Sequence, residues 1–287
     1  MKLDDIYSQN KQIISIEIFP PKENFGEKSF ALKSEVSKLM KYKPALISVT
    51  HGAGGTYSGN SLSLIRLIKE NFDISIMPHF TCVNATFESV KKFTNSLTEL
   101  KIDNILALRG DLPKDTEYIC NDFKHADELI DYIKDNTDLS VAAAGYPEKH
   151  PEAASLDEDI EYLFNKTQKG AKHIFTQLFF DNEIFRNYFE KVMSKDNKLT
   201  IIPGILPVLS YSQVTRMCGL CGTKIPKFLY ENIEKFKDKP DDLRKFGTEY
   251  AINQIKDLQN FGIKNFHMYT LNKANVISSI LDEITEK

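Results

Sequence analysis

The chain has 287 residues, of which 41% are hydrophobic and 27% are charged, a balance typical of a globular protein with enough apolar side chains for one sizeable core. Its formal net charge of -3 argues against a general nucleic-acid binder, which would carry a basic excess. No apolar run approaches a membrane span, residues 1–12 lack a secretory pattern, and four cysteines do not suggest a disulfide scaffold, so we expect a cytoplasmic protein.

Short apolar runs alternate with longer segments whose apolar residues recur at helical spacing. The runs cover residues 13–19, 45–50, 74–81, 104–108, 139–144, 173–179, 199–203 and 265–270. The helix-like segments cover 29–42, 60–71, 87–100, 125–136, 156–169, 184–194, 243–260 and 273–285. Eight strand–helix units in this length predict an α/β fold with a closed parallel barrel, the (β/α)₈ TIM type. We expect one catalytic domain over residues 1–287, with two or three helices between residues 203 and 264.

A barrel of this kind carries its functional groups at the carboxyl ends of its strands. The unusual polar residues and glycines of this chain fall late in the predicted strands or directly after them. They are Glu17, Thr50, His51, His79, Arg109, Gly110, Asp111, Tyr146, His150, Gln177 and Tyr269. Residues without a function would be scattered over both ends of the barrel. The one-sided placement therefore predicts an enzyme.

Glu17 lies in the first run, which alternates with a period of two. Ile14, Ile16 and Ile18 are expected to face the surrounding helices, whereas Ser15 and Glu17 face the barrel interior. A carboxyl group inside a barrel loses the solvation of its charged form, which suits it to donate a proton. The spacing alone is equally compatible with a structural glutamate that pairs with a basic residue in the core.

The fourth run ends in a charged turn. Gly110 lets the backbone approach a ligand, Arg109 can bind phosphate with paired donors, and Asp111 can form a hydrogen bond with a heterocycle. The alternative is an Arg109–Asp111 salt bridge that closes the loop. The glycine-rich segment after the second run fails the G-x-G-x-x-G pattern because Tyr57 occupies the last position. We interpret that segment as an active-site loop rather than part of a Rossmann domain.

Two further segments contain residue types that can bind a ligand or a metal. Tyr146 and His150 lie in a proline-stiffened loop that can cover a flat ring or contact a ribose, although a surface loop without function is the alternative. Cys218 and Cys221 have C-x-x-C spacing, but no second pair completes a zinc site. We interpret them as ordinary thiols, with a redox pair as the alternative. The six histidines form no metal-binding motif, so no metal is expected.

Taken together, these segments resemble the methylenetetrahydrofolate reductase family, in the bacterial form that consists of the catalytic barrel alone. The resemblance runs from about residue 15 to residue 276 and keeps the family's order of motifs. The motifs are EIFPPK (17–22), SVTHGAGGT (48–56), HFTC (79–82), LALRGDLP (106–113), AGYPEKHPEA (144–153), TQLFFD (176–181), PGILPV (203–208) and FHMYTLNK (266–273). The chain departs from the family pattern at His51, Met217 and Lys273.

The resemblance implies a non-covalently bound FAD, NADH or NADPH as reductant, and reduction of 5,10-methylenetetrahydrofolate to 5-methyltetrahydrofolate by ping-pong hydride transfer, which feeds methionine synthesis. Glu17 matches the family's general acid, and Asp111 matches the carboxylate beside the flavin. The positions that match FAD contacts are Thr50, His51, His79, Leu108, Arg109, Gly110, Asp111, Ala144, Tyr146, His150, Asp159 and Lys166. The positions on the substrate side are Glu17, Gln177, Gln213, Tyr269 and Lys273.

The chemistry of the substrate fits these roles. The methylene bridge accepts hydride poorly until protonation of a ring nitrogen opens it to an iminium cation, and a protonated Glu17 can supply that proton. The negative charge of Asp111 favours the cation, and Arg109 and Lys166 offset the charge of the FAD pyrophosphate.

Three alternatives remain at this stage. One is another flavin barrel, such as a proline-dehydrogenase-like enzyme. Another is a Schiff-base lyase, which needs a lysine inside the barrel, but the eight runs contain none. The last is a barrel subunit that docks an electron-transfer partner through the region of Cys218 and Cys221. We also expect a homo-oligomer, with no nucleic acid and no membrane as partner.

Overall fold

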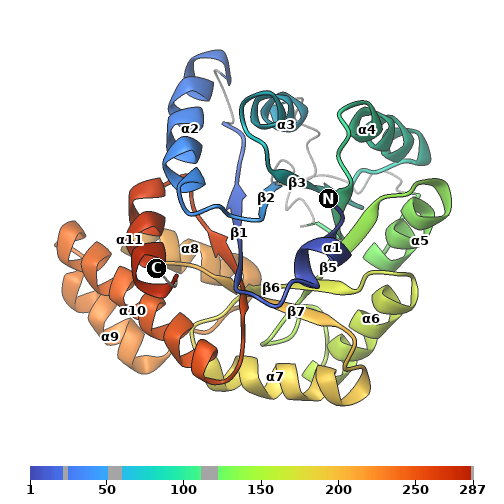
Figure 1. Cartoon of the computed structure of the whole chain (residues 1–287). Helices are drawn as coiled ribbons and strands as arrows, with labels where there is room; N and C mark the ends of the chain where they lie inside the picture. The colour runs from blue at the N-terminus through green and yellow to red at the C-terminus, as the bar shows by residue number, and fades with distance from the viewer. Residues whose placement is uncertain (22–24, 51–59, 111–121, 286–287) are drawn as a thin grey trace.

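The structure, a computed structural model, describes residues 1–21, 25–50, 60–110 and 122–285. Eight parallel strands close into a barrel in chain order, and β8 pairs with β1 (Figure 1). The strands are β1 (Ile13–Ile18), β2 (Leu46–Val49), β3 (Ser75–Thr81), β4 (Asn104–Leu108), β5 (Ser140–Gly145), β6 (His173–Leu178), β7 (Thr200–Ile205) and β8 (Asn265–Tyr269). The predicted (β/α)₈ barrel is confirmed, and every strand lies within two residues of its predicted bounds.

Helices surround the barrel, apart from one short helix that lies across one of its ends (Figure 1). This short helix is α1 (Leu3–Tyr7). The surrounding helices are α2 (Phe25–Met40), α3 (Asn60–Asn71), α4 (Phe87–Glu99), α5 (Ala126–Asn136), α6 (Leu156–Gln168), α7 (Asn182–Lys195), α8 (Tyr211–Cys221), α9 (Lys227–Phe236), α10 (Pro240–Asn260) and α11 (Ala274–Ile284). The extra helices expected between β7 and β8 are α8, α9 and α10.

The outer core lies between the strands and the helices. Ile14, Ile16 and Ile18 belong to it, as the alternation in the first run predicts. Successive residues of a strand point to opposite sides, so Ser15 and Glu17, which alternate with these isoleucines, point into the barrel. A separate apolar cluster packs α8, α9 and α10 over the ends of β6 and β7, through residues such as Leu178.

The inner core fills the amino-terminal end of the barrel. Leu3 and Ile6 of α1 are almost fully buried there, against Met77, Leu106 and Phe175. Burial of two such side chains stabilises the fold by about 1.5–3 kcal/mol each, so α1 acts as a plug for this end. The opposite end, where the strands finish, is the end that remains for a ligand.

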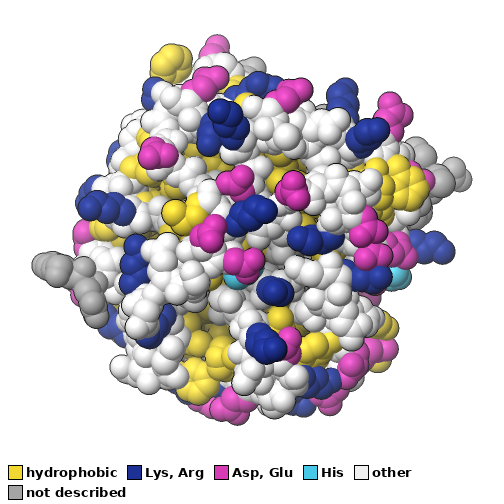
Figure 2. Space-filling view, turned by 45° about the vertical axis from the view of Figure 1, so that its right-hand side comes forward, with side chains coloured by type: hydrophobic (Ala, Val, Ile, Leu, Met, Phe, Trp, Pro, Cys, Tyr) yellow, Lys and Arg dark blue, Asp and Glu magenta, His cyan; other side chains and the backbone are white. Residues whose placement is uncertain are grey.

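The surface carries both signs of charge. Acidic and basic side chains are interspersed over the face that Figure 2 shows, with apolar side chains between them. Within the described part of the chain, no helix is long and apolar enough to cross a membrane.

Candidate active site

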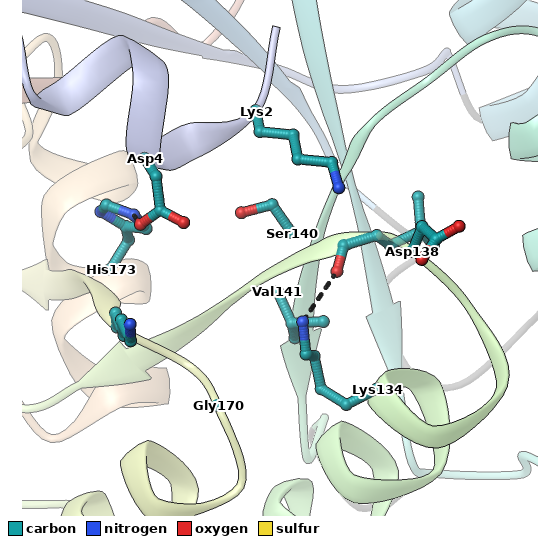
Figure 3. A pocket seen from close by; sticks show the side chains of 10 residues that line it. Lys2, Asp4, Lys134, Asp138, Ser140, Val141, Gly170 and His173 are labelled. Atoms are coloured by element: carbon teal, nitrogen blue, oxygen red, sulfur yellow. Dashed lines mark hydrogen bonds and ion pairs between the residues drawn. The ribbon is translucent and has the colours of Figure 1, made fainter.

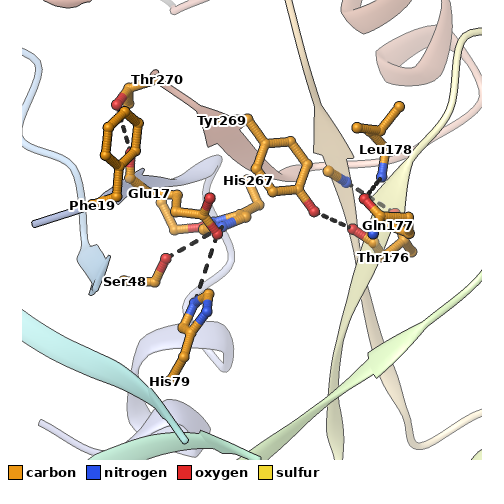
Figure 4. Close-up of polar contacts among 12 residues, drawn as sticks. Glu17, Phe19, Ser48, His79, Thr176, Gln177, Leu178, His267, Tyr269 and Thr270 are labelled. Atoms are coloured by element: carbon orange, nitrogen blue, oxygen red, sulfur yellow. Dashed lines mark hydrogen bonds and ion pairs between the residues drawn. The ribbon is translucent and has the colours of Figure 1, made fainter. Parts of the chain in front are cut away.

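Glu17 lies at the carboxyl end of β1 and points into the barrel, where two histidines face it (Figure 4). Its Oε2 atom is 3.7 Å from Nε2 of His79 in β3 and 3.8 Å from Nε2 of His267 in β8. These distances exceed those of a direct hydrogen bond, so both contacts are close polar approaches. The Glu17 side chain keeps 17% of its surface exposed, which leaves the carboxyl group within reach of a ligand at the barrel mouth.

His267 is fixed by hydroxyl groups of two neighbouring strands. Its Nδ1 atom is 2.8 Å from Oγ of Ser15, and its Nε2 atom is 3.4 Å from Oγ of Ser48. Its ring packs edge-on against Phe175 and Tyr269, with centroid distances of 5.1 and 5.4 Å. The imidazole is therefore held rigidly beside the carboxyl group of Glu17.

Tyr269 forms the next wall of the site. Its hydroxyl group donates a hydrogen bond of 2.9 Å to the carbonyl oxygen of Thr176. Burial, followed by the nearby charge of Glu17, raises the pKa of Tyr269 well above its usual value of 10, so the hydroxyl stays protonated. Gly204 makes room for this ring, because a Cβ atom there would lie 2.6 Å from Cε2 of Tyr269.

The carboxyl ends of β1 and β8 are also tied together. The hydroxyl group of Thr270 donates a 2.5 Å hydrogen bond to the carbonyl oxygen of Glu17. Asn272 exchanges two side-chain hydrogen bonds with the backbone of Phe19, at 3.2 and 2.9 Å. These bonds fix the backbone on which the Glu17 side chain is carried.

Tyr146 and Gln177 lie close together at the ends of β5 and β6, where they surround a narrow space with Cys221 and Thr223. The Gln177 side chain folds back, and its Oε1 atom accepts a 2.8 Å hydrogen bond from the backbone of Leu178. The fold thus brings together two residues that the sequence assigned separately to the cofactor and to the substrate.

The loop after β5 holds Tyr146 against His150, with the two rings edge to face at a centroid distance of 4.9 Å. The carboxyl group of Asp159 accepts a hydrogen bond from the backbone of His150. Burial raises the pKa of Asp159, although the charge of Lys166 opposes the shift. The loop is therefore anchored to α6 through a buried carboxyl group.

Lys166 and Arg109 bring positive charge to this side of the barrel mouth. Lys166 donates a 2.6 Å hydrogen bond to the carbonyl oxygen of Ala144, and burial lowers its pKa. Arg109 reaches Glu152 with Nη2 at 2.5 Å, while its buried Nε has no hydrogen-bond partner within the described residues. A buried donor without a partner and a desolvated ammonium group both favour an anionic ligand.

The backbone conformation at residue 110 requires a glycine. Its φ of +85° lies in the left-handed region, and a Cβ atom would lie 2.9 Å from Cβ of Thr81. The chain therefore packs tightly where β4 ends beside Arg109. These features fit a diphosphate-bearing cofactor such as FAD.

The remaining predicted cofactor residues lie either at strand ends or outside the described residues. Thr50, Leu108 and Ala144 lie at the ends of β2, β4 and β5, on the same side as Glu17. His51 and Asp111 lie outside the described residues, so neither the flavin contact of Asp111 nor its salt bridge with Arg109 is described.

Two predicted substrate residues are not joined to the Glu17 group by the contacts that the structure describes. Gln213 accepts a 3.0 Å hydrogen bond from the backbone of Leu209, and its Nε2 atom lies 3.4 Å from Sδ of Met217. Lys273 is exposed at the start of α11, where its charge helps to lower the pKa of Glu35 in α2, against the opposing effect of burial.

The cysteines that the structure describes, Cys82, Cys218 and Cys221, are free thiols. Burial raises the pKa of Cys218 to about 12, so this thiol stays protonated and unreactive. Among the described residues, no group of three or more His, Cys, Asp or Glu side chains could hold a metal ion.

Sequence reasoning missed His267, Ser15 and Ser48 as parts of the site. The available signal was the alternation in residues 265–270, which places His267 on the same inward face as Tyr269. A lone histidine in an apolar run is also typical of an ordinary core residue, so the pattern did not single it out.

Comparisons with known proteins extend over nearly the whole chain. A family model described as "Methylenetetrahydrofolate reductase" matches residues 2–285. The 5,10-methylenetetrahydrofolate reductase of Buchnera aphidicola subsp. Schizaphis graminum is 35% identical over 93% of this chain and 89% of its own length. The enzyme of the same name from Escherichia coli (strain K12) is 32% identical over 93% of this chain and 88% of its own length.

A solved structure has the same fold. It is an uncharacterized protein from Clostridium thermocellum that binds two copies of 5-methyl-5,6,7,8-tetrahydrofolic acid. It superposes with a TM-score of 0.72 at 18% identity, covering 99% of this chain and 98% of its own.

Proposed function

Because the chain belongs to the methylenetetrahydrofolate reductase family, we propose that it reduces 5,10-methylenetetrahydrofolate to 5-methyltetrahydrofolate, with Glu17 as the proton donor. The observation that carries the proposal is the inward carboxyl group of Glu17 at the barrel mouth, 3.7 Å from His79 and 3.8 Å from His267. A partly exposed carboxyl group that points into the barrel mouth is suited to protonate a bound ring nitrogen.

The proposal includes a non-covalently bound FAD that is reduced by NADH or NADPH. When bound, the flavin supplies the hydride for the folate. Arg109 and Lys166 would offset the charge of its pyrophosphate, and Gly110 is the proposed backbone contact beside them. Tyr146 and His150 would contact a ring or a ribose from the loop after β5. Thr50, His51, His79, Leu108, Ala144 and Asp159 complete the proposed cofactor side.

Glu17 would donate its proton to the ring nitrogen of the folate and so open the five-membered ring to a cation. Tyr269 would stay neutral beside it, because burial keeps its hydroxyl protonated. The neutral side chain of Tyr269 adds no charge near the cation that forms. Asp111 is the proposed source of a negative charge that favours this cation. Gln177, Gln213 and Lys273 are the other proposed folate contacts.

Proton transfer of this kind accelerates a reaction by about 10²–10⁴-fold. The remaining rate enhancement must come from positioning, which the tied ends of β1 and β8 support. Closure of the barrel mouth over the ligand would keep water away from the cation.

The wider role follows from the product. We propose that the protein acts in one-carbon metabolism in the cytoplasm, where 5-methyltetrahydrofolate would supply methyl groups for methionine synthesis. We propose that residues 1–287 act as one catalytic domain in a homo-oligomer, and an electron-transfer subunit is the other partner proposed.

The test is anaerobic stopped-flow spectroscopy of the purified protein. We expect a yellow protein whose flavin is bleached by NADH or NADPH and is then reoxidised by methylenetetrahydrofolate. Reoxidation by a proline-derived imine and not by the folate would favour the proline-dehydrogenase-like alternative. A protein that binds no flavin under any refolding or reconstitution condition would contradict the proposal.

A further inference from the structure

We propose that a cavity at the amino-terminal end of the barrel, opposite to Glu17, binds a compact multivalent anion. The cavity has a volume of about 310 Å³ and lies among α1, the end of α5 and the starts of β5 and β6 (Figure 3). Its charged and polar lining includes Lys2, Lys134, Lys172, Asp4, Ser140 and His173. The proposal is independent of the reaction at the other end of the barrel.

The lysines of this cavity carry unbalanced positive charge. Among the described residues, no carboxylate forms an ion pair within 4.0 Å of Lys2, Lys134 or Lys172, whereas other lysines of the protein are paired at 2.5, 2.8 and 2.6 Å. Lys134 reaches only the carbonyl oxygen of Leu139, at 3.4 Å. Three ammonium groups around one hollow, in a protein of net charge -3, concentrate a positive potential there.

The carboxylates of the cavity do not cancel this charge. Asp4 and Asp138 also line it, which leaves three ammonium groups against two carboxylates. Asp4 is engaged by His173, whose Nε2 is 2.9 Å from Oδ1 of Asp4. Burial lowers the pKa of His173, so near neutral pH the ring is uncharged and donates this N–H. The carboxylate of Asp4 is thereby turned toward His173 in β6, as Figure 3 shows.

The backbone beside the cavity is fixed by contacts of the first residues. The terminal ammonium group of Met1 pairs with Asp103 at 2.7 Å, and Asn104 donates a 3.0 Å hydrogen bond to the carbonyl oxygen of Met1. Leu3 is fully buried in the inner core. These contacts fix the chain on both sides of Lys2, so the exposed side chain of Lys2 starts from one defined position at the rim of the cavity.

The lining also limits the size and type of the ligand. A volume of about 310 Å³ is near the lower end of the range of about 300–1,000 Å³ for small-molecule sites. Among the described lining residues, His173 alone carries a ring, and Tyr7 packs against it at a centroid distance of 5.3 Å. A nucleobase would therefore find no free ring to stack on, which favours a compact phosphate or polycarboxylate.

The experiment measures thermal unfolding and calorimetric binding of the full-length protein with pyrophosphate and with citrate, at constant ionic strength and with saturating FAD, so that the proposed cofactor site is filled. We expect a saturable rise of Tm with at least one of them, because a ligand that binds only the folded state stabilises it. Sodium chloride at the same ionic strength should give no saturable rise. Saturation with pyrophosphate alone identifies a phosphate site, and saturation with citrate alone identifies a polycarboxylate site.

The double variant Lys134→Gln/Lys172→Gln tests the place of binding. It should weaken the affinity by about tenfold or more, because charged hydrogen bonds are stronger than neutral ones. The matched control Lys91→Gln/Lys92→Gln removes the same charge from the exposed face of α4 and should bind as the wild type does. Lys2→Gln gives a second, single-residue test of the same site.

Two results would overturn the proposal. One is the absence of saturable binding for both anions in the wild-type protein. The other is an affinity that is equal in the wild type, in Lys134→Gln/Lys172→Gln and in Lys2→Gln. Neither result would bear on folate reduction, since the cavity shares no residue with the Glu17 site.

Discussion

His267 presents Nε2 to Oε2 of Glu17 at 3.8 Å, while its Nδ1 is held by Oγ of Ser15 at 2.8 Å. The Ser15 hydroxyl also lies 3.3 Å from the carbonyl oxygen of Phe266, to which it can only donate. The ring tautomer with its proton on Nδ1 satisfies both contacts and leaves a lone pair on Nε2. The hydroxyl group of Ser48, whose Oγ is 3.4 Å from Nε2, can donate to that lone pair. Both ring nitrogens of His267 therefore have a hydroxyl partner, and the imidazole is fixed beside the carboxyl group of Glu17.

Replacement of His267 tests this arrangement. His267→Asn removes the ring that lies beside Glu17 and a partner of the buried Ser15, so we expect slower folate reduction and a loss of about 1–3 kcal/mol of stability. Stopped-flow rates and urea unfolding measure the two effects. His79→Asn is the matched comparison, because His79 approaches the same oxygen of Glu17 from β3. Folate reduction at the wild-type rate in His267→Asn would contradict a role of this ring in positioning Glu17.

Gly204 is expected to be essential for the position of Tyr269. A Cβ atom there would lie 2.4 Å from the carbonyl oxygen of Thr176 and 2.6 Å from Cε2 of Tyr269. Gly204→Ala should therefore cost about 1–3 kcal/mol in urea unfolding and weaken folate binding. Gly219→Ala is the control, since a Cβ atom in that α8 position meets nothing within 4 Å and should be neutral or stabilising. Equal stability of the two variants would contradict the packing argument.

Lys166 is predicted to contribute to cofactor affinity. Lys166→Met keeps the apolar stem of the side chain but removes the ammonium group that binds the carbonyl oxygen of Ala144. We expect FAD affinity to fall by about tenfold or more, measured by flavin fluorescence on dilution. Lys169→Met, at the end of the same helix, removes a charge that pairs only with Asp131 on the surface and serves as the control. If both variants retain FAD equally, Lys166 is not a cofactor ligand.

His173 is expected to make stability depend on pH. Burial lowers its pKa below the usual 6.5, although the hydrogen bond with Asp4 opposes the shift. The unfolded chain then binds more protons than the folded protein as the pH falls through 6.5. The contribution of His173 to stability is therefore fully present above pH 6.5 and is lost below it. His173→Gln should flatten the fall of Tm between pH 7 and pH 5, and an unchanged slope would show that other groups cause it.

The barrel and the direction of Glu17 could be predicted because both depend on periodicity. Alternation with a period of two decides which side of a strand faces inward, and it placed Ile16 outside and Glu17 inside. The five-residue helix α1 could not be predicted from periodicity. It is too short for a helical pattern and has no side-chain cap hydrogen bond, so it depends on the burial of Leu3 and Ile6.

The partners of Glu17 could not be predicted from the sequence. His79 was predicted as a cofactor contact, and its approach to Glu17 depends on how the strands are arranged around the barrel. The approach of His267 depends on the register that pairs β8 with β1, because alternation gives the side on which a residue lies but not its neighbour across the strands. For Gln213 and Lys273, the described contacts are local, with Met217 and with the charge of Glu35.

The most direct test of the account is the folate half-reaction of Glu17→Gln, followed by anaerobic stopped-flow with Glu70→Gln, an exposed position of α3, as the control. We predict that Glu17→Gln binds FAD and is reduced by the nicotinamide at the wild-type rate. Its reoxidation by methylenetetrahydrofolate should slow by about 10²–10⁴-fold, because the amide cannot donate the proton that opens the ring. Reoxidation at the wild-type rate would contradict the assignment of Glu17 as the acid.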